Sequence, residues 1–569
     1  AQLNDNADME KVSAKIKNVK LDAVGPDEKR FKAAMFLQPM KNWHLRADFK
    51  NGVNNGGRIQ YVWLFGIVGL FVLLLACINF MNLSTARSEK RAKEVGVRKA
   101  IGSARSHLIA QFFSESFLVV IFAFVLSLVL VTISIPFFNE IADKKITMLW
   151  QNPFFWMMGA GFSIFTGLVA GSYPALYLSS FQPVKVLKGT FRVGRFASVP
   201  RKVLVVLQFT VSVALIIGTI VVFRQIQHAK NRPVGYNKES IISAGTNEAL
   251  HSKFDALRNE LKSSGTVVEM AESSSAVTEV WNTNGGFMWE GKDPNQAVDF
   301  PNTAVTPEFG KVIGWQIKEG RDFSRDFATD SAAFILNESA VKFIGLKDPV
   351  GKTITWENQP FRVIGVVKDM LVESAYQPIR ASMYHCSYEE GNILLMKVNP
   401  LLSANDAIGK LENIFKKYDP ATAFEFNFVD EDFAKKFGDE ERIGKLASVF
   451  AVLAVFISCL GLFGLASFVA EQRTKEIGIR KVVGASVFNL WRLLSKDFVL
   501  LVIIACAIAV PLAWYGMGQW LQQYDYRAAI SWWIFAAAVA GALLITILTV
   551  SFQAIKAALS NPVKSLRTE

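Results

Sequence analysis

Cysteine and histidine are scarce in this sequence of 569 residues. Four cysteines occur, and Cys77, Cys459 and Cys506 lie inside apolar runs, so no disulfide framework is available. The five histidines lack the spacing of metal ligands, which argues against a zinc site. Neither a Gly-x-Ser-x-Gly elbow nor a His-Glu-x-x-His pair occurs. The sequence therefore gives no support for an enzyme.

A nucleotide-binding loop is lacking as well. The stretch Gly345 to Thr353, GLKDPVGKT, resembles one, but five residues separate Gly345 from Gly351 where that loop requires four. Asp348-Pro349 and Gly351 are typical of a turn. We predict a turn here, and no ATPase and no bound cofactor in this chain.

Acidic residues are fewer than basic residues, and the net charge is +13. The excess of basic residues is distributed unevenly along the chain. Residues 224–441 carry a net charge of −8, so the rest of the chain carries +21. These bases stand in short loops beside apolar runs, as the positive-inside rule expects of a membrane protein. With 51% hydrophobic residues and a mean hydropathy of +0.27, the sequence indicates membrane lipids as partners and no nucleic acid.

Apolar runs of the length of a membrane span occur seven times. They are Tyr61–Met81, Phe117–Ile135, Phe154–Leu178, Val203–Phe223, Leu446–Val469, Phe498–Trp514 and Ile530–Phe552. The basic loops Arg87–Arg105, Lys185–Lys202 and Arg473–Lys481 and the C-terminus belong on the inner side. Residues 1–58, 136–153, 224–445 and 515–529 are then predicted outside.

A charged stretch occurs twice in the chain. Residues 91–103 read RAKEVGVRKAIGS and residues 473–485 read RTKEIGIRKVVGA. At a constant offset of 382, Glu94, Gly96, Arg98, Lys99 and Gly102 recur as Glu476, Gly478, Arg480, Lys481 and Gly484. Further on, Ser172 and Pro183 recur as Ser551 and Pro562 at an offset of 379. The chain therefore contains an internal duplication.

Two interpretations of the repeated stretch stay open. Its bases suit anchoring in lipid headgroups. A glycine inside a helix costs about 1 kcal/mol relative to alanine, which anchoring leaves unexplained at Gly96 and Gly478. We favour docking of a partner, with the glycines allowing close approach and the charges directional pairing. The repeated acids Glu115 and Asp497 are interpreted as first-turn residues of the helices that follow.

The outer region 224–445 has mixed α/β patterns. Strands are predicted at Ala333–Leu336, Phe361–Val367, Ile393–Val398 and Ala423–Val429. A helix is predicted over Ala404–Tyr418, with Ser403 or Asn405 as its cap. About 200 residues are enough to bury a core.

The predicted fold is an α-helical integral membrane protein with seven transmembrane helices, 3+4 from a duplicated four-helix module, and a mixed α/β outer domain. The predicted parts are residues 1–58, the end of a first outer domain; 59–202, three helices; 203–223, the first helix of the second module; 224–445, the outer domain; and 446–569, three helices. If the first half had the same plan as the second, it would begin with a helix and an outer domain. We therefore expect that this helix and most of this domain are missing from the chain.

Several of these motifs resemble one family. The Glu-Val-Gly-Val-Arg-Lys-Ala-Ile-Gly and Glu-Ile-Gly-Ile-Arg-Lys-Val-Val-Gly segments, the Gln-Pro-Val and Asn-Pro-Val endings, and the outer Asp-Pro-Val-Gly-Lys-Thr and Val-Ile-Gly-Val-Val-Lys-Asp stretches occur in order. Together they resemble the FtsX-like/MacB-like permeases of bacterial ABC transporters, in the duplicated, Bacteroidetes-type form. The resemblance implies a multi-pass protein of the bacterial inner membrane with a large periplasmic domain.

The resemblance also implies a function. The expected role is a non-catalytic permease subunit that couples ATP hydrolysis by a separate cytosolic ATPase dimer to periplasmic movement, for export or release of a lipoprotein, peptide or drug. The ten repeated residues named above would form the ATPase-coupling segments, with ATP and Mg on the partner. Residues 224–445 would offer a surface to a periplasmic partner. The alternative is an ATP-independent membrane receptor or scaffold that presents this domain.

Overall fold

The computed structural model describes residues 2–50, 52–179, 199–293, 295–389 and 391–559, and these form two compact units. The helical bundle consists of residues 59–225, 440–523 and 528–569. The α/β unit consists of residues 1–58, 226–439 and 524–527. Pro183, Lys185, Pro562 and Lys564 of the duplicated pattern lie outside the described residues.

Long helices make up the bundle. They are α4 (Ile59–Ala100), α5 (Arg105–Ala142), α6 (Pro153–Ser179), α8 (Val199–Lys230), α15 (Gly438–Gln472), α16 (Thr474–Val482), α17 (Val487–Leu521) and α18 (Trp532–Leu559). Among the described residues, seven of them are long and apolar enough to cross a membrane, as predicted. Most extend well beyond the predicted spans. The 42 residues of α4 rise about 60 Å, roughly twice the thickness of a bilayer core.

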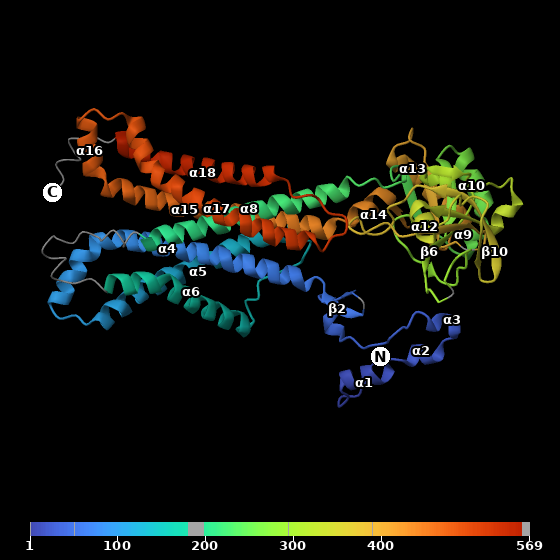
Figure 1. The fold of residues 1–569 in the computed structure, drawn as a ribbon, viewed down its shortest axis with the longest axis horizontal. Helices are drawn as coiled ribbons and strands as arrows, with labels where there is room; N and C mark the ends of the chain where they lie inside the picture. The colour runs from blue at the N-terminus through green and yellow to red at the C-terminus, as the bar shows by residue number, and fades with distance from the viewer. Residues whose placement is uncertain (1, 51, 180–198, 294, 390, 560–569) are drawn as a thin grey trace. The chain divides into compact units, whose positions relative to one another are not determined.

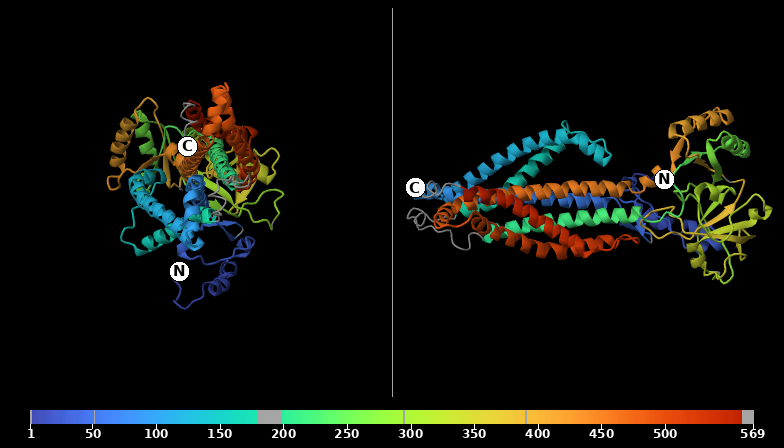
Figure 2. Two further views of the ribbon diagram at one scale, coloured as in Figure 1. Left: turned by 90° about the vertical axis from the view of Figure 1, so that its left-hand side faces the viewer. Right: turned by 90° about the horizontal axis from the view of Figure 1, so that it is seen from above.

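The two modules have matching places in the bundle. In the views of Figures 1 and 2, α4, α8 and α15 lie between the pair α5 and α6 and the pair α17 and α18. The second module has a large buried cluster, which includes Val213, Ile217, Val502 and Ala509. Alanine and other small residues let these helices approach closely, which is how helices associate in lipid.

The α/β unit is built on a mixed sheet. Its strands are β3 (Ile241–Gly245), β4 (Val267–Ser273), β5 (Thr283–Asn284), β6 (Phe300–Val305), β7 (Ile317–Gly320), β8 (Ala333–Asn337), β9 (Thr353–Trp356), β10 (Gln359–Val367), β11 (Met383–Cys386), β12 (Ile393–Val398) and β13 (Phe426–Phe428). The order along the sheet is β13-β3-β12-β4-β6-β11-β8-β10-β7, with β5 beside β6 and β9 beside β10. The pairs β6–β11 and β8–β10 are parallel and the other pairs are antiparallel.

Short helices join and cover the strands. They are α9 (Glu248–His251), α10 (Phe254–Ser263), α11 (Phe309–Ile313), η2 (Ala328–Ala332), α12 (Glu338–Ile344), α13 (Ala404–Tyr418) and α14 (Val429–Lys435). Leu257 and Leu261 of α10 and Leu411 of α13 pack on β4 and β12 in one core cluster. The remainder of the unit contains α1 (Met9–Ile16), α2 (Val19–Ala23), α3 (Pro26–Lys29), η1 (Met40–Asn42) and the hairpin β1 (Asp48–Lys50) and β2 (Val53–Gly56).

The strand and helix predictions in this unit are largely confirmed. Strands β8, β10 and β12 lie where their apolar runs predicted, and α13 begins after Ser403, whose hydroxyl accepts a hydrogen bond from the Asp406 amide. The predicted strand Ala423–Val429 is shorter. Only Phe426–Phe428 pairs with β3, because Val429 already opens α14.

The stretch that resembles a nucleotide loop forms a turn, as predicted. Gly345 ends α12 with a φ of +77°, and Gly351 has a φ of +91° just before β9. Asp348 also adopts a positive φ, of +52°. Such backbone favours glycine and tolerates aspartate.

Candidate functional site at the two duplicated segments

We call residues 91–103 the first segment and residues 473–485 the second segment. The first segment continues α4, which runs without a break to Ala100. The second segment forms a helix of its own, since α15 ends at Gln472 and α16 begins at Thr474. For Glu94 and Gly96 the structure describes only the helical backbone.

Both segments end in the same turn. The Ser103 and Gly102 amides donate to the Arg98 and Lys99 carbonyls, over 3.0 and 3.1 Å. The Ala485 and Gly484 amides donate in the same way to the Arg480 and Lys481 carbonyls, over 2.9 and 3.1 Å. This pair of bonds is a Schellman motif, which requires a left-handed residue at its centre. Gly102 and Gly484, with φ of +100° and +97°, supply it.

The repeated lysines bind within the chain. Lys99 Nζ donates to the Ser179 carbonyl over 2.6 Å, and Lys481 Nζ donates to the Ala558 carbonyl over 2.9 Å. Ser179 and Ala558 are 379 residues apart, at the ends of α6 and α18. Carbonyls at a helix C-terminus lack partners in the helix and attract cations. The lysines thus tie each segment to the last long helix of its own module.

Partial burial and the nearby Arg105 lower the pKa of Lys99. The arginines have other contacts. Arg98 Nη1 donates to Gln111 Oε1 over 2.7 Å, and Arg480 Nη2 pairs with Glu476 Oε1 over 2.7 Å. The Arg480–Glu476 pair spans one helical turn and is about half exposed, so the pair contributes little stability. Both of its members remain accessible to a partner.

The reason predicted for the repeated glycines needs a correction at Gly478. This residue is buried inside the bundle, in α16, which packs on α18. Its neighbour Ile477 lies in a cluster with Leu490, Ala554 and Ala558. The chain itself covers Gly478, so a partner surface cannot approach this glycine closely.

Sequence reasoning missed an apolar pair on each segment. Val97 and Ile101 are 44% and 80% exposed, and Ile479 and Val483, at the offset of 382, are 55% and 81% exposed. Each pair is four residues apart, so its members lie on one helix face. The offset of 382 marks both pairs in the sequence, but their exposure does not follow from it. Apolar residues repeated beside bases and left exposed are typical of an interaction surface.

The repeated acids are not first-turn residues, which corrects a further prediction. Glu115 lies ten residues into α5, and Asp497 lies ten residues into α17, because both helices begin earlier than their apolar runs. Asp497 pairs with Arg473 at the start of the second segment over 3.2 Å. Glu115 Oε1 accepts from Gln111, the residue that also binds Arg98. Asp497 thus contacts the second segment directly, and Glu115 is linked to the first segment through Gln111.

A junction in the α/β unit joins segments that adjoin three different helices. Arg232, just after α8, donates to the Ala375 and Gln377 carbonyls over 3.0 and 2.6 Å. Tyr526, between α17 and α18, donates its amide to the Tyr376 carbonyl over 3.0 Å. Lys436, just before α15, donates to the Glu373 carbonyl over 2.8 Å. The backbone of residues 373–377 is therefore held by Arg232, Tyr526 and Lys436.

Comparison with known families accounts for most of the chain. The family described as FtsX-like permease C-terminal matches residues 66–183 and again residues 448–562, and the MacB-like periplasmic core domain matches residues 203–414. The chain belongs to the FtsX/MacB-type ABC permeases. Both segments of this permease lie inside the regions that match twice, which agrees with the duplication. The permease is a multi-pass membrane protein with a domain of the MacB periplasmic type.

Relatives of the permease are export proteins by name. A macrolide export ATP-binding/permease protein MacB of Chromobacterium violaceum is 25% identical over 279 residues, 47% of this chain and 43% of that protein. The probable syringafactin export ATP-binding/permease protein SyfD of Pseudomonas syringae is 24% identical over 225 residues, 37% of this chain and 34% of that protein. The chain thus spans less than half the length of these relatives.

Solved structures of periplasmic regions are similar to part of the permease. The periplasmic region of MacB from Actinobacillus actinomycetemcomitans is 17% identical, with a TM-score of 0.27, and the match covers 36% of this chain and 96% of that one.

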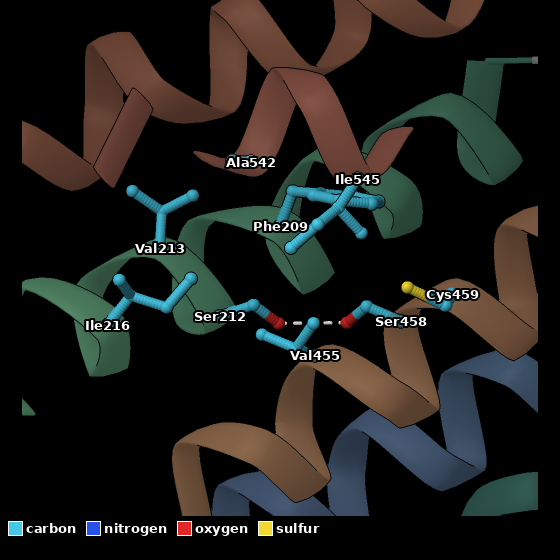
Figure 3. Close-up of a pocket in the computed structure, with 9 residues that line it drawn as sticks. All are labelled: Phe209, Ser212, Val213, Ile216, Val455, Ser458, Cys459, Ala542 and Ile545. Carbon is cyan, nitrogen blue, oxygen red and sulfur yellow. Dashed lines mark hydrogen bonds between the residues drawn. The ribbon is translucent and has the colours of Figure 1, made fainter. Parts of the chain in front are cut away.

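A small cavity lies in the helical bundle of the permease, between α8, α15 and α18. Its volume is about 10 Å³, and its lining includes Phe209, Val455 and Ile545 (Figure 3). On one side Ser212 and Ser458 share a hydrogen bond of 2.8 Å between their hydroxyls. A space of this size holds at most about one water molecule, so it is a packing defect and not a substrate site. Among the described residues no group of His, Cys, Asp or Glu is arranged to hold a metal.

Proposed function

We propose that this permease couples ATP hydrolysis by a separate cytosolic ATPase dimer to movement of its periplasmic domain, in the bacterial inner membrane. The transported or released substrate belongs to the cell envelope, such as a lipoprotein, a peptide or a drug. The names of the relatives, which join an ATP-binding part to a permease part, support an ATPase partner. ATP and Mg are assigned to that partner, because the chain's own loop at Gly345 lacks the nucleotide spacing.

The observation that carries the proposal is the exposed apolar pair on each segment. Val97 with Ile101, and Ile479 with Val483, stand beside Arg98 and Arg480 in both modules. A small apolar patch with a basic rim is the composition of a protein interface, in which the apolar residues supply affinity and the charges supply orientation. Each segment would bind one ATPase subunit.

The lysines give the segments a mechanical role in this proposal. Because Lys481 ties the second segment to the end of α18, a push on the segment would move α18 along with it. The loop before α18 contains Tyr526, which holds the Tyr376 carbonyl of the α/β unit. A helix that is tied to the segment at one end and continues along the chain into this loop at the other end is suited to transmitting movement from the ATPase to the periplasmic domain.

The test is the double variant Ile101→Glu with Val483→Glu. These residues are exposed, so the fold tolerates the change, and acidic residues have little effect on membrane orientation. We expect loss of ATPase co-purification and of ATPase stimulation. Leu401→Glu is the matched control, since Leu401 is 90% exposed in the α/β unit. If the double variant binds the ATPase as the parent does, the segments are lipid anchors and the receptor or scaffold function gains support.

A further inference from the structure

The two modules meet through equivalent helices, α4 of the first and α15 of the second. Phe65 stacks on Phe450 with ring centroids 5.9 Å apart. Farther along, Asn79 Nδ2 donates to the Ile457 carbonyl over 2.5 Å. Leu83 lies over Gly464, where a Cβ would come within 2.3 Å of Leu83 Cδ2. Residue numbers rise together along both helices, so the helices pack in parallel.

At one position a residue faces its own duplicate. Asn79 and Gly461 are 382 residues apart, the offset of the duplication, and a Cβ on Gly461 would lie 1.9 Å from Asn79 Oδ1. In an interface with twofold symmetry, only residues next to the axis contact their own equivalents. Asn79 and Gly461 therefore mark the axis that relates the two modules.

The two modules have opposite residue sizes at this axis. Asn79 is 9% exposed, and its side chain occupies the space that Gly461 leaves open. Two first modules would bring two asparagines into a space that holds one. Two second modules would bring two glycines together and leave a gap, without the bond to the Ile457 carbonyl. Packing and hydrogen bonds decide helix association in lipid, because apolar burial gives no preference there.

We propose that Asn79 and Gly461 are the specificity determinants of module pairing in this permease. They make the two halves of one chain each other's partner at this face and exclude a second copy of the chain from it. The proposal rests on the packing of α4 against α15 alone and does not depend on the ATPase.

An exchange of the two residues tests the pairing in the full chain. Asn79→Gly alone removes the hydrogen bond and leaves a gap, and Gly461→Asn alone places two asparagines at the axis. Each should lower the thermal unfolding midpoint of the detergent-solubilised protein. Because the position lies on the axis, the double exchange Asn79→Gly with Gly461→Asn restores one asparagine opposite one glycine. We expect its midpoint to return most of the way to that of the parent.

The control for an added polar group is Gly69→Asn. Gly69 lies in the same membrane span of α4, and a Cβ added there would meet nothing within 4 Å, so this variant reports the effect of an asparagine without a clash. The proposal expects Gly69→Asn to lower the midpoint less than Gly461→Asn. Effects that add up in the double exchange, or a Gly69→Asn midpoint as low as that of Gly461→Asn, would overturn it.

Cross-linking tests whether the partner is the same chain. Phe65→Cys and Phe450→Cys, in a chain whose four native cysteines are replaced by alanine, leave Asn79 and Gly461 intact. With a short thiol cross-linker in membranes we expect a link within one chain, seen as one fragment after cleavage between the modules. A covalent dimer of two differently tagged copies would show that α4 and α15 of separate chains pair, and would refute the proposal.

Discussion

Protonation of His385 should weaken the α/β unit in mildly acidic solution. His385 is 5% exposed in β11, its Nδ1 lies 3.0 Å from Asn302 Oδ1, and the ring of Trp356 lies 5.3 Å from its own. Burial lowers the pKa of His385 to about 4. An unfolded histidine has a pKa of about 6.5. Between these values the unfolded chain holds more protons, so stability falls as the pH falls.

The size of the effect follows from the two pKa values. The pKa values of His385 in the folded and unfolded chain differ by about 2.5, which corresponds to about 3 kcal/mol in the free energy of unfolding. About 2 kcal/mol of this is lost between pH 7 and pH 5. The stability is present in full above pH 6.5 and is lost as the pH approaches 4. The carboxylates with lowered pKa, such as Glu269 and Asp330, lose their contribution only at lower pH.

Urea unfolding of residues 226–439 expressed alone measures this effect. The core clusters of the sheet lie within these residues, so we expect the fragment to unfold in one cooperative transition. The control is His385→Phe, which keeps an aromatic ring beside Trp356 and removes the titrating group. The parent should lose about 2 kcal/mol between pH 7 and pH 5 and the variant much less. An equal loss in both proteins would refute the reasoning, because another group would then carry the pH dependence.

Three further predictions concern the bundle, the orientation of the chain and the junction inside the α/β unit. Gly484 has a φ of +97°, so Gly484→Ala should destabilise the detergent-solubilised protein by about 1–2 kcal/mol. The control Gly541→Ala, in open space on α18, should not; equal thermal unfolding midpoints for the two variants would contradict the Schellman motif. In cells with a permeabilised outer membrane, single cysteines at Ser103 and Ala485 should be shielded from an impermeant thiol reagent, and a cysteine at the exposed Asn295 should react with it. Labelling at Ser103 would show that the predicted membrane orientation is wrong. Arg232→Met should leave ATPase binding intact but lower transport, because it releases the Ala375 and Gln377 carbonyls; unchanged transport would remove the junction from the coupling route.

Local patterns in the sequence predicted local structure well. The helix Ala404–Tyr418 and its Ser403 cap depend on residues within a few positions, and the structure confirms both. The seven spans follow from apolar runs in the same way. Their ends were harder to predict, since polar helix outside the membrane has no apolar signal. For this reason the first-turn interpretation of Glu115 was wrong.

The contacts of the duplicated segments could not be predicted, because they join distant residues. The Lys99 ammonium binds a carbonyl 80 residues away, and nothing in the repeated pattern identifies Ser179 as the partner. The burial of Gly478 depends on the return of α18 to the second segment. Val97 and Ile101 have the spacing of a buried helix face, and only the packed structure shows that this face is exposed.

The stoichiometry of the purified complex tests the central claim most directly. If the two segments of one chain each bind an ATPase subunit, native mass spectrometry of the complex should give one permease chain with two ATPase subunits. The variant Val483→Glu, which keeps the first segment intact, should weaken the second contact and shift the complex toward one ATPase subunit. A complex of two permease chains with two ATPase subunits, or a permease that binds none, would contradict the account.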